Sequence, residues 1–199
     1  MVEVGPGTGR LLGWLASTGR RCLAVDQHAA PAGLPDGVEW RLGDAVALPL
    51  PAAAFDAVLL LDLLEHVDDR AALAEAARVL RPGGQLLVTV PALPLLWSFR
   101  DEAAGHLRRY TATTLRARLR EAGFAIERLF GYQVSLLPLL VAHRLLGRHD
   151  PATREREDHP NPWLNRALVW WNRVDGRVSE RLQVPFGSSL VVLARKVAT

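Results

Sequence analysis

The chain of 199 residues has one cysteine, one methionine and one lysine, and it has no long uninterrupted apolar run. The single Cys22 excludes an internal disulfide and is typical of a reducing compartment. It lies in an apolar run, which favours a buried structural thiol over a nucleophile. No run of about 18 apolar residues predicts a bilayer span, and the opening residues do not resemble a secretory signal. We therefore expect a cytoplasmic protein.

Positive charge comes almost entirely from arginine, because Lys196 is the only lysine, and the formal net charge is +3. The arginines alternate with acidic residues and form no long basic block, so a nucleic-acid partner is not expected. Hydrophobic residues make up 49% of the chain, which is normal for a globular protein. The length predicts a single domain over residues 1–199.

A glycine-rich stretch, Glu3-Val4-Gly5-Pro6-Gly7-Thr8-Gly9, opens the chain and leads into an amphipathic segment. It predicts a strand that turns sharply into a helix, because glycine accepts positive φ and lets the backbone come close to a ligand. Arg10 stands where a dinucleotide-binding fingerprint has its last glycine, which argues against an NAD site.

Strand patterns alternate with helix patterns along most of the chain, which predicts an α/β fold with a doubly wound, mostly parallel sheet. Ligands of such sheets bind outside the carboxyl ends of the strands. Gly5, Asp26, Asp44 and Asp62 each follow a predicted strand, so we expect them to meet at one edge. The predicted strands cover residues 2–4, 22–26, 38–45, 55–61, 85–91, 124–130 and 189–194.

Residues 133–187 form a long insertion before the last predicted strand. An apolar stretch over 134–146 is followed by a charged, proline-punctuated loop over 148–162 and a predicted helix over 163–182. The expected apolar side of that helix carries Leu164, Leu168, Trp171, Val178 and Leu182. Two interpretations stay open: a helical cap that buries its own core, or a surface over 134–182 that covers a greasy substrate or lies on a membrane.

Five motifs occur in order: the glycine-rich stretch, Asp26, Gly43-Asp44-Ala45, Leu64-Glu65-His66-Val67 and Arg81-Pro82-Gly83-Gly84. Together they resemble the class I S-adenosylmethionine (AdoMet)-dependent methyltransferases of the type 11/23 group, which are related to ubiquinone-pathway enzymes. The resemblance covers about residues 1–130 and the last strand. It implies a seven-stranded Rossmann-like sheet, AdoMet as cofactor and S-adenosylhomocysteine as product. Relatives usually have more chain upstream, so we expect a truncated start.

The resemblance also implies which residues bind the cofactor. Glu3 orders the glycine loop near the methionine amino group, Asp26 accepts hydrogen bonds from the ribose, and Asp44 reaches the adenine amino group. The full implied set is Glu3, Gly5, Gly7, Gly9, Asp26, Asp44, Ala45, Leu61 and Asp62.

The segment from Trp97 to Tyr110 ends in Gly105-His106-Leu107-Arg108-Arg109-Tyr110, which resembles the signature of a methyltransferase subgroup. In the functional interpretation His106 is a general base or substrate anchor, and Arg108 or Arg109 is an anion clamp. Tyr110 is then a further catalytic candidate, and Trp97 a further substrate contact. In the alternative, an arginine pairs with Asp101 in a structural turn and Tyr110 packs ahead of the next helix.

His66 is a second candidate base, because histidine changes charge near neutral pH. Asp62, Glu65 and His66 are spaced so that one helical turn presents all three, and His106 is a fourth candidate metal ligand. A similar arrangement binds a divalent metal in some ubiquinone-pathway and small-RNA methyltransferases. Many relatives carry Leu-Glu-His without a metal, so in the alternative Glu65 and His66 only shape the site.

The expected function is methyl transfer from AdoMet to a small-molecule or lipid-like acceptor, at oxygen. The alternative is a non-catalytic AdoMet-fold protein that serves as a binding or partner subunit. A NAD oxidoreductase is a more distant option because Arg10 replaces the required glycine.

Overall fold

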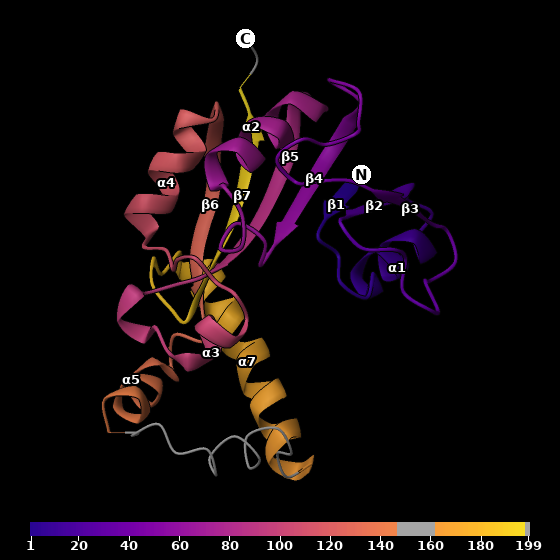
Figure 1. The fold of residues 1–199 in the computed structure, drawn as a ribbon. Helices are drawn as coiled ribbons and strands as arrows, with labels where there is room; N and C mark the ends of the chain where they lie inside the picture. The colour runs from indigo at the N-terminus through magenta and orange to yellow at the C-terminus, as the bar shows by residue number, and fades with distance from the viewer. Residues whose placement is uncertain (147–161, 198–199) are drawn as a thin grey trace.

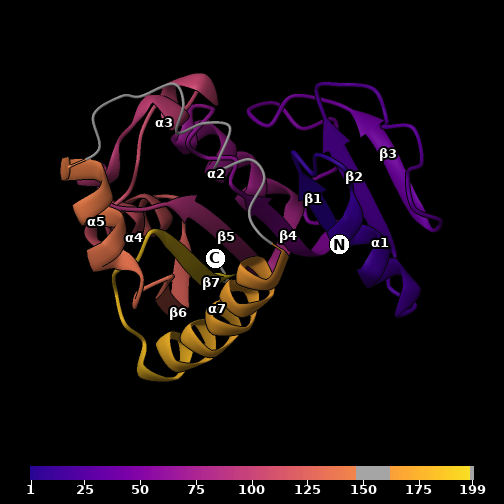
Figure 2. The ribbon, with the colours of Figure 1, turned by 90° about the horizontal axis from the view of Figure 1, so that it is seen from below.

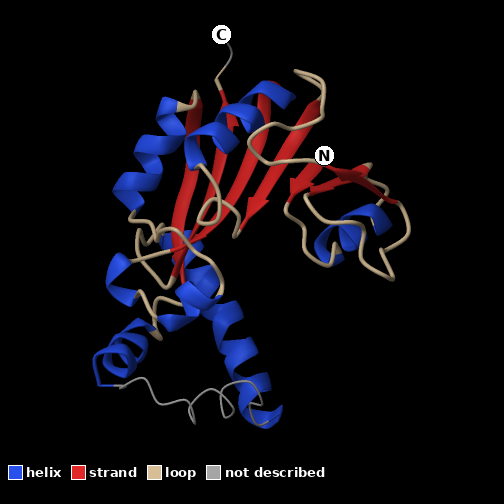
Figure 3. Cartoon of the chain, in the orientation of Figure 1, coloured by secondary structure: helices blue, strands red, loops and turns tan. Residues whose placement is uncertain are grey.

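The computed structural model describes residues 1–146 and 162–197, which form one seven-stranded sheet with helices on its faces (Figures 1 and 3). The strand order is β3-β2-β1-β4-β5-β7-β6. The strands are β1 (Val2–Val4), β2 (Cys22–Asp26), β3 (Val38–Leu42), β4 (Phe55–Leu61), β5 (Leu80–Pro91), β6 (Phe124–Tyr132) and β7 (Ser189–Lys196).

Every strand pair from β3 to β5 is parallel, and β7 runs antiparallel to both of its neighbours. This confirms the predicted mostly parallel, Rossmann-like seven-stranded sheet. The strand β5 begins earlier than expected, because Leu80 already pairs with Phe55 before a register irregularity. Because the strands from β3 to β5 run parallel, their carboxyl ends lie at one edge of the sheet, which we call the carboxyl edge.

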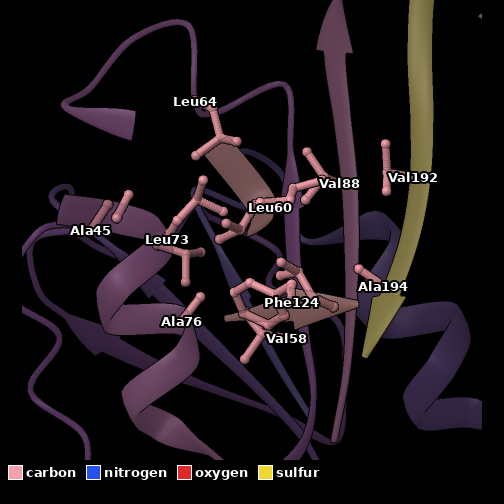
Figure 4. Packing of buried hydrophobic residues seen from close by; sticks show 14 of the residues in the cluster. Ala45, Val58, Leu60, Leu64, Leu73, Ala76, Val88, Phe124, Val192 and Ala194 are labelled. Atoms are coloured by element: carbon pink, nitrogen blue, oxygen red, sulfur yellow. The ribbon is translucent and has the colours of Figure 1, made fainter. Parts of the chain in front are cut away.

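Helices α1 (Arg10–Ser17), α2 (Asp69–Val79) and α4 (Ala112–Glu121) cover the sheet. Leu12 of α1 packs on one face with Cys22 and Ala24, so the thiol is buried as expected. The larger core lies on the opposite face under α2 and α4 (Figure 4). There Leu73 and Phe124 are almost fully buried. Alternate residues of β2 enter the two cores, because side chains of a strand alternate between faces.

Beyond the carboxyl edge the chain continues into η1 (Pro94–Leu96), α3 (Phe99–Ala103), α5 (Leu137–Leu146) and α7 (Pro162–Leu182). In the chain, the helices α5 and α7 follow β6 and precede β7. Both extend past the carboxyl edge (Figure 1). The expected loop over 148–162 lies outside the described residues, apart from its last residue. Among the described helices, none is long and apolar enough to cross a membrane.

The sequence left open whether the expected apolar side of α7 is buried in a cap or exposed, and in the structure it is largely exposed. Trp171, Val178 and Leu182 are 46%, 50% and 68% exposed. Among the α7 side chains whose burial the structure describes, Asp175 and Ser179 are buried. The helix docks through polar groups, because Asp175 accepts hydrogen bonds from the backbone N–H groups of residues 134 and 135.

Removing the N-cap of α2 should destabilise the protein by about 1 kcal/mol. The Asp68 carboxylate accepts hydrogen bonds from the N–H groups of Arg70 and Ala71, which have no partner inside the helix. Asp68→Ala leaves these groups without that partner, and urea unfolding measures the change. Asp56→Ala is the matched control, since it removes only an exposed ion pair with Arg81 and should change stability by less than about 0.5 kcal/mol. Equal stability of the two variants would contradict the capping role.

Candidate functional site

A pocket of about 350 Å³ opens at the carboxyl edge, where β1, β2 and β4 end. This volume is within the range of about 300–1,000 Å³ that small-molecule sites occupy. The lining residues are Val4, Gly5, Gly7, Val25, Asp26, Gln27, His28, Gly43, Ala45, Asp62, Leu63, His66 and Val67.

The loop after β1 forms one wall of the pocket. Gly5 has φ of 70°, and a Cβ added there would lie 2.9 Å from the Leu63 side chain. Gly7 has φ of 55°, and nothing lies within 4 Å of the position where its Cβ would be. Glycine is therefore required at both positions for the backbone angle, and the second leaves open space beside the backbone.

Glu3, in β1 two residues before Gly5, is only 4% exposed. Its Oε2 atom is buried without a hydrogen-bond partner, and burial raises the pKa of its carboxyl group from 4.5 to about 7. A buried carboxylate without a counter-charge is costly. This orphaned acceptor is suited to a cationic ligand group in the adjoining pocket.

The residues expected to bind the cofactor divide into those that line the pocket and those that do not. Asp26, Ala45 and Asp62 line the pocket with Gly5 and Gly7. Glu3, Gly9, Asp44 and Leu61 are not among the lining residues, although each is close in sequence to one that is. Their assigned roles in binding the cofactor stay predictions.

The three aspartates of this edge are held by different interactions. Asp26 accepts hydrogen bonds from the backbone N–H and the Nδ1 atom of His28. Asp44 accepts one from the N–H of Val46. Asp62 has φ of 48°, a sparsely populated conformation for a non-glycine residue, and Thr89 of β5 donates to its carboxylate. These contacts orient carboxylate oxygens around the pocket.

The imidazole of His106 is oriented by a carboxylate. Its Nδ1 atom lies 3.0 Å from Oδ1 of Asp101, which is 1% exposed. Arg109 donates to both oxygens of Asp101, at 2.7 and 3.1 Å. Burial works to raise the pKa of Asp101, but the hydrogen bonds from Arg109 and His106 outweigh it and lower that pKa. Asp101 thus stays ionised and holds His106 with Nε2 directed away from the pair.

His66 connects this pair to the pocket that it lines. The rings of His66 and His106 meet edge-on with centroids 4.7 Å apart. Burial and the nearby His106 lower the pKa of His66. Glu65 is 1% exposed with an unpartnered Oε2, and burial raises its pKa to about 8. One ligand atom from each of Glu65, His66 and His106 lies within 4.8 Å of the others. Asp62 is not part of that group.

Arg108 and Arg109 hold backbone in place. Arg108 donates to the carbonyl groups of Leu64 and Val67, and Arg109 donates to that of Ala92 in addition to its pair with Asp101. The alternative in which an arginine pairs with Asp101 is therefore the arrangement found. The Arg109 side chain is 11% exposed and that of Arg108 is 34% exposed. Their role as an anion clamp stays a prediction.

Tyr110 and Trp97 lie outside the pocket lining. The Tyr110 hydroxyl is buried and donates to Asp69 and to the Leu64 carbonyl, and burial raises its pKa. This geometry is that of a packing residue ahead of α4. Trp97 is 38% exposed and its ring N–H lies 3.4 Å from Glu102.

The contact between Asp101 and His106 was not predicted from the sequence. Leu63, Gln27 and His28 were not predicted to line the pocket. Asp101 was considered only as a partner for an arginine. A capping-box pattern was a usable signal, because Ser98 and Asp101 have the required spacing and both of its hydrogen bonds are present. Leu63 carries no chemical signal, since only the fold places it against Gly5.

Comparisons with known proteins agree with this geometry. A family model described as a methyltransferase domain matches residues 2–88. The chain is 34% identical over 139 residues to a probable S-adenosylmethionine-dependent methyltransferase of Mycolicibacterium smegmatis, covering 66% of this chain and 54% of that protein. It is 36% identical over 112 residues to the 27-O-demethylrifamycin SV methyltransferase of Amycolatopsis mediterranei, covering 52% and 41%. The chain thus spans about half the length of these curated relatives, or less.

A solved S-adenosylmethionine-dependent methyltransferase from Mesorhizobium loti has the same fold, with a TM-score of 0.60 at 21% identity. The match covers 98% of this chain and 89% of that one. The glycine loop, the pocket at the carboxyl edge and the match over residues 2–88 lead to one conclusion: this part of the chain is a methyltransferase domain, and the chain has the class I fold of the AdoMet-dependent methyltransferases.

Proposed function

We propose that this chain transfers a methyl group from AdoMet to a hydroxyl of a small or lipid-like acceptor. The observation that carries the proposal is Glu3, two residues ahead of the Gly5 that lines the pocket, whose buried carboxylate has an oxygen without a partner. Pairing with a cationic group offsets the cost of burying such a charge. Bound AdoMet supplies an activated methyl group on a cationic sulfonium, together with an amino group of the same sign.

The residues of the carboxyl edge position the reactants. The turn of Gly5 and Gly7 admits the methionine portion, while Asp26 and Ala45 line the region proposed for the nucleoside. Alignment of donor and acceptor is worth up to about 7–11 kcal/mol in favourable cases. Water leaves such a pocket as it fills, which strengthens the electrostatic interactions within it.

His106 is the proposed general base for the acceptor hydroxyl. Asp101 binds its Nδ1 atom, which leaves Nε2 to accept a proton, and the same carboxylate stabilises the ring once it is charged. His66 lies between this base and the pocket. The relative from Amycolatopsis is named as the methyltransferase of a 27-O-demethyl compound, and this name supports methyl transfer to oxygen.

Isothermal calorimetry with AdoMet tests the proposal directly. We expect saturable binding with one site per chain and a dissociation constant of about 1 μM to 1 mM, the usual range for enzyme ligands. A panel of hydroxylated acceptors is then screened for S-adenosylhomocysteine formation. Absence of binding at millimolar AdoMet would overturn the proposal. Binding without turnover on any acceptor would favour the non-catalytic partner protein.

Replacing Glu3 with glutamine should stabilise the protein at high pH. The folded state keeps a proton on Glu3 up to about pH 7, whereas the unfolded state releases it near pH 4.5. The wild-type protein therefore loses stability as the pH rises through this window, by up to about 3 kcal/mol. Glu3→Gln lacks this loss, so urea unfolding should show equal stability below pH 4.5 and a more stable variant above pH 7.

The same substitution should weaken AdoMet binding by about 10–100-fold, because a hydrogen bond to a charged group contributes about 1.5–3 kcal/mol. Glu39→Gln, on the exposed side of β3, is the matched control and should change neither property. A Glu3→Gln protein that binds AdoMet as well as the wild type would show that this carboxylate has no role in the site.

Replacing His106 with glutamine should lower kcat by about 10²–10⁴-fold and leave AdoMet binding intact, because only proton transfer is lost. His28→Gln is the control, since His28 lines the pocket, which His106 does not, and its side chain is 90% exposed. Turnover is measured as S-adenosylhomocysteine release. A kcat of the His106 variant within threefold of wild type would exclude the base assignment.

A divalent metal at Glu65, His66 and His106 is a second proposal for the same site. The unpartnered Oε2 of Glu65 and the hydrogen bond between the His106 ring and Asp101 fit a metal site, since ligating histidines usually donate their other N–H. A metal held there would supply Lewis acidity toward the acceptor oxygen.

We expect Zn²⁺ or Mn²⁺ to raise the melting temperature of the wild-type protein and not that of Glu65→Gln. Glu102→Gln, in the neighbouring α3, is the control that should keep the shift. A melting temperature and a turnover rate that are the same in EDTA and in either metal would exclude the site.

A further inference from the structure

The outer side of α7 carries two parallel rows of exposed residues. Trp163, Trp170, Val174 and Val178 follow one another at intervals of seven, four and four residues, which places them along one face of a helix. Trp163, Trp170 and Val178 are 76%, 63% and 50% exposed. We call these four residues the apolar row. Contiguous exposed apolar residues of this kind mark an interaction surface.

The second row is basic. Arg166, Arg173, Arg177 and Arg181 repeat the same intervals, three residues after each member of the apolar row, and all four are exposed. A helical residue adjoins the one three positions later, so the two rows run side by side. We call these arginines the basic row.

The acids of α7 do not neutralise this surface. Asp175 is buried on the opposite side and accepts hydrogen bonds from backbone N–H groups at the start of the insertion. Glu180 is paired at 2.7 Å with Arg128 of β6. The described part of α7 therefore presents tryptophan and valine next to a row of positive charge.

Within residues 1–146 and 162–197, α7 is held from the side opposite to this surface. The helix packs on β6 through its polar side, where Gly176 allows the Tyr132 ring to approach. Its N-terminal half projects past the carboxyl edge, toward the side of the molecule on which the pocket opens (Figures 1 and 2).

We infer that α7 binds the surface of an anionic lipid bilayer. An interfacial helix buries an apolar side with tryptophan at the headgroup level and presents basic side chains to anionic lipids. Guanidinium groups pair with phosphate oxygens bidentately, which suits a row of arginines beside the apolar row. Docking in this way places the pocket edge near the bilayer. The inference does not depend on methyl transfer.

Co-sedimentation with lipid vesicles tests the inference without cofactor or acceptor. We expect the full chain to bind vesicles of phosphatidylcholine with about 30% phosphatidylglycerol, and to bind phosphatidylcholine alone at least tenfold less. Binding should weaken as salt is raised, because surface charges are screened. Equal binding to both vesicle types, or no binding to either, would overturn the inference.

Two double variants test the contribution of each row to vesicle binding separately. Trp170→Ser with Val178→Ser should reduce the partition coefficient at least tenfold by removing buried apolar area. Arg173→Gln with Arg177→Gln should reduce it by about 30-fold on anionic vesicles. All four side chains are exposed, so circular dichroism and the melting temperature should stay unchanged.

Matched controls lie at other places on the surface. Trp14→Ser removes a tryptophan of α1 that is 64% exposed, and Arg20→Gln with Arg21→Gln removes two exposed arginines ahead of β2. Both should bind vesicles as the wild type does, and equal losses in these controls would contradict a specific role for α7. If ultracentrifugation instead shows a dimer that Trp170→Ser and Val178→Ser abolish while vesicles are not bound, the surface belongs to a second copy and the inference is wrong.

Discussion

Two buried carboxylates at the carboxyl edge constrain this molecule more than any other interaction. Glu3 and Glu65 are each almost fully buried, and each keeps one oxygen without a partner. Burial raises both pKa values, to about 7 and about 8. A sequence selected for stability alone would place amide or apolar side chains there, because unpaired buried charge is destabilising. The two groups are explained if ligands complete them, which makes this edge the functional side of the fold.

Asp101 performs a different task. Its carboxylate forms hydrogen bonds with the His106 ring, the Arg109 guanidinium and the backbone N–H of Ser98. One side chain thus connects three parts of the segment after β5. Tyr110 then anchors the end of that segment to α2 through Asp69. The hydrogen bonds that orient His106 thus also attach it to the main core, and this rigidity is what the proposed role as a base requires.

Much of the fold follows from local patterns. The glycine stretch and the apolar strands predicted β1, α1 and β2 nearly residue by residue, because turn chemistry and apolar runs act within a few residues. The convergence of Gly5, Asp26 and Asp62 was also predictable, since parallel strands end at one edge. The pairing of Arg109 with Asp101 was open at that level, as was the outward side of α7. Both depend on neighbours that are distant in the chain.

The sequence by itself determined the strand–helix alternation, the glycine turn and the family, because periodicity, glycine conformation and motif order are properties of short segments. Only the tertiary structure decided that Glu3 and Glu65 lack partners, that Asp101 holds His106, and that α7 turns its tryptophans outward. The physical reason is that burial and hydrogen-bond satisfaction depend on which distant residues surround a group, and the chain order does not specify them locally.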